Sequence, residues 1–161
     1  MSLRIHISIA RQELTLFDDA RELIRYPVST GERGVGEERG SYRTPRGQHL
    51  IRAKIGAGQA ANTVFVARRP SGEIYTPELG QAFPERDWIL TRILWLSGCE
   101  PAFNRLGCVD TMRRYISIHG SPDSVIMGNP GSHGCIRMRN ADIVDLFDRV
   151  APYTPVDIDK N

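Results

Sequence analysis

Tyr115-Ile-Ser-Ile-His-Gly120 is followed, after a loop rich in proline and glycine, by Gly131-Ser-His-Gly-Cys-Ile-Arg-Met138. The first run alternates polar and apolar residues, so residues 115–119 are predicted to form a strand that ends at His119. The second run places Cys135 between small and polar residues. A thiol with two imidazoles nearby in the sequence is a candidate nucleophilic site.

The residues beside Cys135 suit acyl chemistry. Gly134 has no side chain where a substrate backbone would have to approach, and it tolerates a strained backbone. Successive amide N–H groups in such a turn can converge on one point and stabilise an oxyanion. A neighbouring imidazolium would lower the pKa of the thiol from about 8.5 towards neutrality.

Two histidines are candidates for the base. His133 and Cys135 would point to the same face if the loop is extended. His119 ends a strand, and the backbone carbonyl of Gly120 could hold the imidazole N–H and fix its tautomer. Spacing alone does not separate the two, and His133 is equally a candidate for shaping the loop.

Less specific interpretations of this stretch stay open at this point. A lone cysteine in a glycine-rich loop is more often unreactive than catalytic. A zinc site would have only three such ligands here, without a Cys-x-x-Cys or His-x-x-x-His pair, so no metal is expected. The side chains of Arg137 and Arg139 are by default solvated.

The remainder of the chain has mostly the pattern of short strands, which are predicted at residues 4–9, 13–17, 23–28, 48–55, 63–68, 72–75 and 156–158. Residues 88–96 fit a helix or a buried strand, and a strand is favoured. Residues 29–47 lack an apolar period and are expected to form a long exposed loop. The segment up to Pro84 is rich in proline, and His6 and His49 are expected on strand surfaces.

Residues 140–150 carry the clearest helical pattern, with Asn140 as the N-cap and Asp142 in the first turn. The apolar face is formed by Ile143, Val144, Phe147 and Val150, and Pro152 ends the helix. We therefore expect one mainly β domain over residues 1–161, with one C-terminal helix.

Composition excludes several classes of function. The net charge of +2 does not favour a nucleic-acid partner. The N-terminus has no signal-like apolar core and no stretch is long enough for a membrane span, so a cytoplasmic location is expected unless a leader was removed. Cys99 and Cys108 could bridge, but a reducing compartment would leave them as small buried hydrophobes.

The motifs resemble a known family. His119-Gly120 and, after a spacer, Ser132-His-Gly-Cys-Ile-Arg-Met138 are similar to the signature of the YkuD family of L,D-transpeptidase catalytic domains. Thr44-Pro-Arg-Gly47 resembles the family's Thr-Pro-x-Gly turn, and Asn140 follows at the usual distance. The similarity extends from about Ile5 to Ile158. It implies a β-sandwich or barrel-like domain with a helix after the catalytic loop.

The resemblance also implies roles for the site. Cys135 would be the nucleophile and His119 its base, oriented by the Gly120 carbonyl. The oxyanion donors would lie on the amides of His133, Gly134 and Cys135, in the loop that includes Ser132. Arg137 would support this loop or meet a substrate carboxylate. An arginine among Arg92, Arg105, Arg113 and Arg114 could also read a substrate carboxylate, and the sequence selects none of them. No cofactor is implied.

The substrates of the family are peptidoglycan stem peptides or muropeptides. Attack on the third residue, usually diaminopimelate, expels the terminal D-alanine and leaves an acyl-thioester. Carbapenems acylate the cysteine in this family and are expected to add to Cys135. Water as acceptor gives an L,D-carboxypeptidase, and an amine gives an L,D-transpeptidase that forms 3→3 cross-links. Because the chain resembles signal-less members that look like cytoplasmic recycling enzymes, the carboxypeptidase is favoured and the transpeptidase is the alternative.

Overall fold

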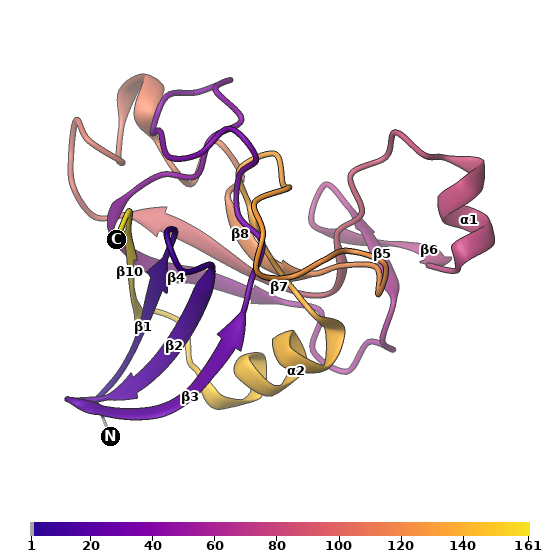
Figure 1. Ribbon diagram of the computed structural model, residues 1–161, viewed down its shortest axis with the longest axis horizontal. Helices are drawn as coiled ribbons and strands as arrows, with labels where there is room; N and C mark the ends of the chain where they lie inside the picture. Colours follow the sequence, from indigo (N-terminus) through magenta and orange to yellow (C-terminus); the bar gives the residue numbers. More distant parts are fainter. Residues whose placement is uncertain (1) are drawn as a thin grey trace.

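The computed structural model describes residues 2–161 and consists mainly of one mixed, 10-stranded sheet (Figure 1). The main path of the sheet has the order β3-β2-β1-β10-β4-β7-β5-β6, and β8 and β9 continue from β7. The strands are β1 (Leu3–Ser8), β2 (Glu13–Asp18), β3 (Arg21–Pro27), β4 (Gly47–Ile55), β5 (Thr63–Val66), β6 (Arg69–Ile74), β7 (Leu90–Gly98), β8 (Ser117–Gly120), β9 (Ile136–Met138) and β10 (Pro155–Asp159).

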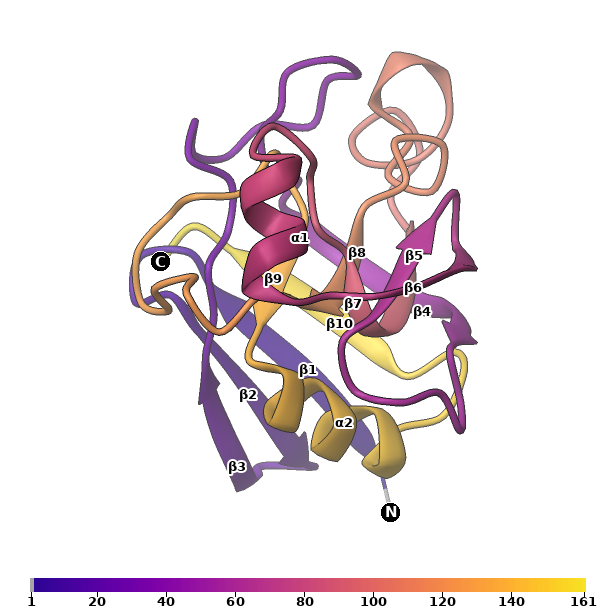
Figure 2. The same ribbon diagram turned by 90° about the vertical axis from the view of Figure 1, so that its right-hand side faces the viewer.

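β7 is the strand at which the sheet branches. It pairs antiparallel with β4, with β5 and with β8. β8 then pairs parallel with β9, which is followed directly by α2 (Asn140–Arg149) (Figure 2). The loop before β9 is therefore held beside the strand that carries His119.

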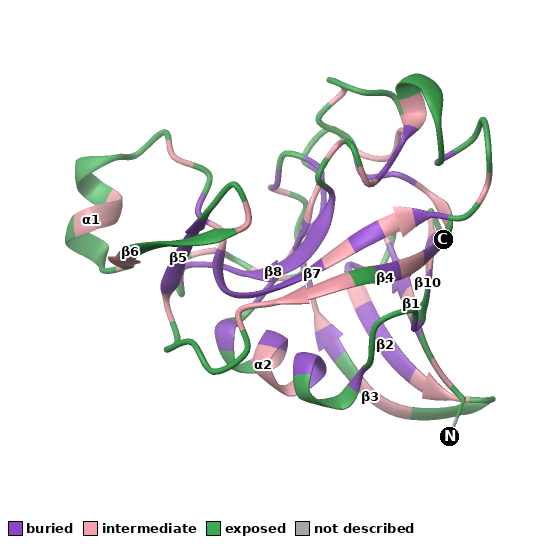
Figure 3. Cartoon of the chain, turned by 180° about the vertical axis from the view of Figure 1, so that it is seen from behind, coloured by how far each residue is buried: buried purple, intermediate pink, exposed green. Residues whose placement is uncertain are grey.

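The main core lies between α2 and the sheet. Ile118 and Ile136 from the paired strands β8 and β9 are fully buried, as are Ile143 and Leu146 on the inner face of α2. Burying an aliphatic side chain of this size stabilises a fold by roughly 1.5–3 kcal/mol. This packing fixes the segment that precedes and follows Cys135. Figure 3 shows the contrast with α1 (Pro77–Ala82), which has no buried residue.

The expectation of a mainly β fold with a helix after the glycine-rich loop is confirmed. The ambiguous run at residues 88–96 forms β7, as favoured. The short strands expected near residues 72–75 and 156–158 are present as β6 and β10. The predicted strand at residues 115–119 begins only at Ser117, because Tyr115 has a φ of 58° and belongs to a tight turn.

Two expectations about helices were wrong. The proline-rich segment contains α1, which is too short to show an apolar period; it begins after Thr76, whose hydroxyl accepts a hydrogen bond from the backbone N–H of Leu79. Asn140 is not the N-cap of α2 but its first helical residue, and Arg139 precedes it without a side-chain cap. The Asn140 side chain instead bonds to Thr91 and Asn62.

The expected exposed loop at residues 29–47 is anchored at both ends. Ser29, Thr30 and Thr44 are buried, since the loop exchanges backbone hydrogen bonds with Ser132 and Arg137. His49 was expected on a surface but is 1% exposed, because β4 is an interior strand and the imidazole binds the Gly47 carbonyl and the Thr111 hydroxyl.

The cysteines outside the glycine-rich loop also differ from expectation. Cys99 and Cys108 are free and exposed, not buried, because the segment that carries them runs over the surface after β7. They therefore offer accessible thiols for comparison with Cys135. In residues 2–161, no helix has the length and apolar character needed to cross a bilayer.

Candidate active site

The parallel pairing of β8 with β9 places the Cys135 side chain against Ser117. In this register Ile118 lies opposite Ile136, so the residues before each of them are neighbours as well. The sulfur of Cys135 accepts a hydrogen bond from the backbone N–H of Ser117 at 3.4 Å, and its thiol reaches the Tyr115 carbonyl at 3.6 Å. The hydrogen bond from the Ser117 N–H therefore stabilises the thiolate form of Cys135.

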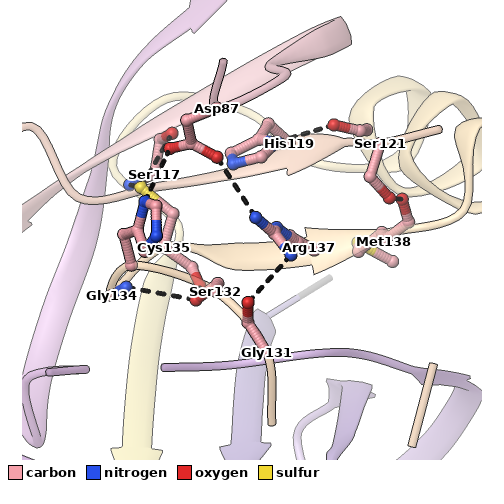
Figure 4. A network of polar contacts seen from close by, with 12 residues as sticks. Asp87, Ser117, His119, Ser121, Gly131, Ser132, Gly134, Cys135, Arg137 and Met138 are labelled. Carbon is pink, nitrogen blue, oxygen red and sulfur yellow. Dashed lines mark hydrogen bonds and ion pairs between the residues drawn. The ribbon is translucent and has the colours of Figure 1, made fainter. Parts of the chain in front are cut away.

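His119 lies on the same strand as Ser117, two residues further on. Its Nδ1 is 2.6 Å from the carbonyl oxygen of Gly120. Because a carbonyl only accepts hydrogen bonds, Nδ1 carries the proton in the neutral ring, and Nε2 presents its lone pair. Nε2 is buried and has no hydrogen-bond partner among the described residues. In Figure 4 the imidazole edge opposite the Gly120 bond points towards Asp87 and Cys135.

Gly120 is closely packed against Asn140 and Leu90. A Cβ at position 120 would collide with the side-chain oxygen of Asn140 and with the Leu90 carbonyl. Asn140 in turn accepts a hydrogen bond from the Thr91 hydroxyl at 2.6 Å. Thr91 has a φ of 76° and lies where the register between β7 and β8 shifts. The carbonyl that orients His119 is therefore fixed by α2 and by an irregularity in β7.

Burial determines the resting protonation state of the two groups. It raises the pKa of the Cys135 thiol, an effect that the Ser117 N–H bond only partly offsets. It also lowers the pKa of His119, against the effect of the Gly120 carbonyl. The sequence had suggested a thiol pKa lowered by an imidazolium. The structure instead favours a neutral thiol beside a neutral imidazole, because both charged forms would lose hydration.

The turn before Cys135 has a defined hydrogen-bond pattern. The Ser132 hydroxyl donates to the Cys135 carbonyl and accepts from the Gly134 N–H at 3.1 Å. The Gly134 N–H is thus occupied, whereas the N–H groups of His133 and Cys135 have no acceptor among residues 2–161. Gly134 has a φ of 120°, and a Cβ there would lie 3.0 Å from the Arg43 carbonyl. The position therefore strongly favours glycine.

Thr44 of the Thr-Pro-Arg-Gly motif fixes this turn through hydrogen bonds. The Thr44 hydroxyl donates to the Gly134 carbonyl at 2.8 Å and accepts from the Gly31 N–H. On the other side, the backbones of Ser29 and Arg137 exchange two hydrogen bonds. Residues 29–44 thus hold the glycine-rich turn in its conformation, a role that local sequence patterns did not indicate.

Arg137 supports the turn and is paired with an acid. Its guanidinium donates to the Gly131 carbonyl at 3.0 Å and lies 3.2 Å from the carboxylate of Asp87 (Figure 4). Asp87 is 3.9 Å from Nδ1 of His133 and acts electrostatically on both Cys135 and His119. Sequence reasoning missed Asp87, because it lies in the irregular segment between α1 and β7 and carries no motif.

The two candidate histidines have different environments. His119 is 1% exposed, has a fixed tautomer and has a free nitrogen. The side chain of His133 is 58% exposed and stacks edge-on against Tyr42. A base for a half-buried thiol needs an unoccupied nitrogen at that thiol. The geometry therefore favours His119 over His133 for proton transfer.

Within residues 2–161, no group of three His, Cys, Asp or Glu side chains is arranged to hold a metal ion. Cys135 with its N–H donor and His119 with its buried ring of fixed tautomer have the features expected of a thiol and its base. These residues of the mainly β fold form the candidate active site.

The sequence model of the YkuD family, described as the L,D-transpeptidase catalytic domain, matches residues 2–158. The chain belongs to this family. Since the match includes both β8 and the turn before β9, the residues of the site described above lie inside the family domain.

Solved structures share the fold. An L,D-transpeptidase from Xylanimonas cellulosilytica DSM 15894 has a TM-score of 0.61 and 20% identity, over 98% of this chain and 60% of that one. An L,D-transpeptidase from Mycobacterium smegmatis has a TM-score of 0.57 and 19% identity, over 98% and 58%. L,D-transpeptidase 3 from Mycobacterium tuberculosis, in complex with a faropenem-derived adduct, has a TM-score of 0.59 and 17% identity, over 98% and 60%.

The chain spans about three fifths of the length of these three structures. At such identities the likeness shows the fold alone. Among curated proteins, none matches the chain significantly.

Proposed function

We propose that the chain is a cysteine-dependent acyltransferase acting on peptidoglycan stem tetrapeptides, with water as the favoured acceptor. Family membership supports L,D-transpeptidase-type chemistry. The observation that carries the mechanism is the unoccupied, buried Nε2 of His119 on the strand that also holds the Cys135 sulfur through Ser117. Cys135 is the nucleophile, His119 the base, and the Gly120 carbonyl the group that orients the base.

Acylation begins with the Cys135 thiol and the His119 imidazole both neutral. The sulfur of Cys135 attacks the carbonyl carbon of the third stem residue while its proton passes to Nε2 of His119. The oxyanion forms beside the amides of His133 and Cys135, the two N–H groups without acceptors. The C–N bond then breaks, and His119 gives the proton to the departing amine. Free D-alanine leaves the site, and the acyl group stays on Cys135 as a thioester.

Deacylation reverses the roles of the reactants. A water attacks the thioester carbonyl and gives its proton to His119, the C–S bond breaks, and the proton returns to the Cys135 sulfur. The product is a tripeptide, which defines an L,D-carboxypeptidase. If the amine of a second stem replaces water, the same steps give a 3→3 cross-link, which is the alternative function.

The arrangement of Asp87 supports water as the acceptor. A second stem peptide would bring an ammonium group, and a free carboxylate at the site would attract it. The Asp87 carboxylate is instead paired with Arg137 at 3.2 Å. A water molecule needs no such recognition.

A cytoplasmic location fits hydrolysis in cell-wall recycling and stays a prediction, to be tested by fractionating cells.

The acceptor is tested by the products from a purified disaccharide tetrapeptide. We expect release of D-alanine and accumulation of tripeptide, followed by mass spectrometry, even when tetrapeptide is in large excess. A Cys135→Ser protein serves as the blank. Dimers forming in place of tripeptide would show that an amine is the acceptor and that the hydrolytic assignment is wrong.

Asp87→Asn is expected to move the acidic limb of the pH–activity profile to lower pH. His119 must be neutral to accept the thiol proton, and the negative charge of Asp87 raises its pKa. Removing that charge lowers the pKa of His119, so the base stays neutral in more acidic solution. The profile of kcat/KM against pH measures the shift.

Asp19→Asn, in the exposed turn between β2 and β3, is the matched control for Asp87→Asn. Its profile should coincide with that of the unchanged protein. An acidic limb that stays in place for Asp87→Asn, or moves upward, would show that Asp87 does not act on the base.

A further inference from the structure

A pocket of about 290 Å³ opens beside Cys135 and carries positive charge. Its lining includes Tyr115, whose carbonyl contacts the Cys135 thiol, and His133, which lies in the same turn as the cysteine. The lining also includes three arginines, Arg39, Arg113 and Arg114. No carboxylate is among the residues that line it.

None of these arginines is in an ion pair. Among the described residues, none of Arg39, Arg113 and Arg114 has a carboxylate oxygen within 4.0 Å. Asp110 acts electrostatically on Arg113 and Glu37 on Arg114, both from beyond that distance, and burial still lowers the pKa of Arg114. Like charges held close together repel. By contrast, Arg137 on the other side of Cys135 is paired with Asp87.

Hydrogen bonds that do not involve the side chains of Arg39 and Arg113 fix the shape of the pocket. The Asp110 carboxylate accepts the backbone N–H groups of Arg113 and Leu106 and so fixes the turn that carries Arg113. Arg114 donates to the carbonyls of Gly36 and Arg43, and so joins the turn to residues 36–43. The side chains of Arg39 and Arg113 make no hydrogen bond within residues 2–161.

One more guanidinium faces the same tyrosine. The Arg68 guanidinium lies 4.1 Å from the centre of the Tyr115 ring and 5.1 Å from that of Trp95. It too has no carboxylate within 4.0 Å among residues 2–161. Stacking orients a guanidinium while leaving its N–H donors free.

We propose that the pocket formed by Arg39, Arg113 and Arg114 beside Tyr115 is the subsite that binds a carboxylate of the acyl-donor peptide. Arg39 and Arg113 are its specificity-determining residues, since their donors are free. Arg114 is a positioning residue that also contributes charge. Arg92 is excluded, because it is buried against Phe147 and donates to the Gln59 and Thr91 carbonyls.

This inference rests on the proposed function for the identity of the donor. A stem tetrapeptide carries a carboxylate on its D-alanine and another on its γ-linked D-glutamate, and diaminopimelate adds a third at the end of its side chain. The first is separated from the attacked carbonyl carbon only by the amide nitrogen and one α-carbon, and the other two lie further away. All three offer the same planar, bidentate partner for arginine. Blocking each in turn distinguishes them.

The test compares four donors: the free tetrapeptide, its C-terminal carboxamide, the form with D-isoglutamine, and the form with the side-chain carboxylate of diaminopimelate amidated. Replacing the recognised carboxylate by an amide should lower kcat/KM by roughly 10-fold or more for the unchanged protein, because charge-assisted hydrogen bonds are lost. Arg39→Gln/Arg113→Gln should lose a similar factor on the free donor, mainly through KM, and no longer distinguish acid from amide. Arg113→Lys, made alone, should keep part of the discrimination.

Arg21→Gln, an exposed arginine at the start of β3 without an ion pair, is the matched control and should behave as the unchanged protein. Equal kcat/KM for all four donors, or undiminished discrimination in the double variant, would overturn the subsite. Binding of the same donors to Cys135→Ser separates this failure from that of the proposed function. Weaker binding of the amide supports the subsite even where no D-alanine is released, and equal binding of acid and amide contradicts it.

Discussion

Cys135→Ser is expected to lower the rate of D-alanine release from a stem tetrapeptide by roughly 10⁴- to 10⁶-fold. In the proposed mechanism the sulfur bonds to the acyl group, and a serine hydroxyl is a far weaker nucleophile beside a base tuned to a thiol. The change removes only the sulfur's contacts with Ser117 and Tyr115, so thermal unfolding should be almost unaltered. Release of D-alanine followed by mass spectrometry measures the effect.

The exposed cysteines supply the control for this experiment. Cys99→Ser/Cys108→Ser removes the other two thiols of the chain and should keep full activity. If Cys135→Ser retained activity, or if the control variant lost it, the nucleophile would have to lie elsewhere.

His119→Gln is expected to lower kcat/KM by roughly 10²- to 10⁴-fold, the range over which a positioned general base acts. Glutamine fills most of the same volume and can still donate to the Gly120 carbonyl, but it cannot accept the thiol proton. The acidic limb of the pH profile should also disappear, since the group whose pKa burial lowers is gone. Steady-state kinetics from pH 5 to 8 would show both effects.

His133→Gln is the matched comparison, because the two histidines were equal candidates from spacing alone. His133 contributes its backbone N–H to the proposed oxyanion site, and its ring is largely solvent-exposed. Its replacement should therefore cost far less than that of His119. A larger loss for His133→Gln than for His119→Gln would reverse the assignment of the base.

Local patterns predicted the elements that surround the site, for a physical reason. The apolar face at Ile143 and Phe147 predicted α2, since the helix buries that face against the core. The alternation of Ile116 and Ile118 with polar neighbours predicted β8, although Ser117 and His119 on its other face are buried as well. Such periodicity is visible in sequence. Leu146 is equally buried, although the predicted face omitted it.

What failed depends on contacts between distant segments. Asp87 reaches the site because the segment between α1 and β7 passes beside Arg137, fifty positions later in the chain. Thr44 is buried because it bonds to Gly134. The Asn140 side chain bonds to Thr91 and therefore does not cap α2. None of these partners shares a local period with its neighbours. The resting charge of Cys135 and His119 likewise follows from burial, which spacing does not show.

The proposed mechanism requires that Cys135 alone accepts the acyl group. The family resemblance implies that a carbapenem acylates the same sulfur. The most direct test is the intact mass of this protein after incubation with imipenem, followed by peptide mapping. We predict an increase of one imipenem-derived group, on the peptide that contains Cys135 and absent from Cys135→Ser. An unchanged mass, or an adduct on Cys99 or Cys108, would contradict the claim.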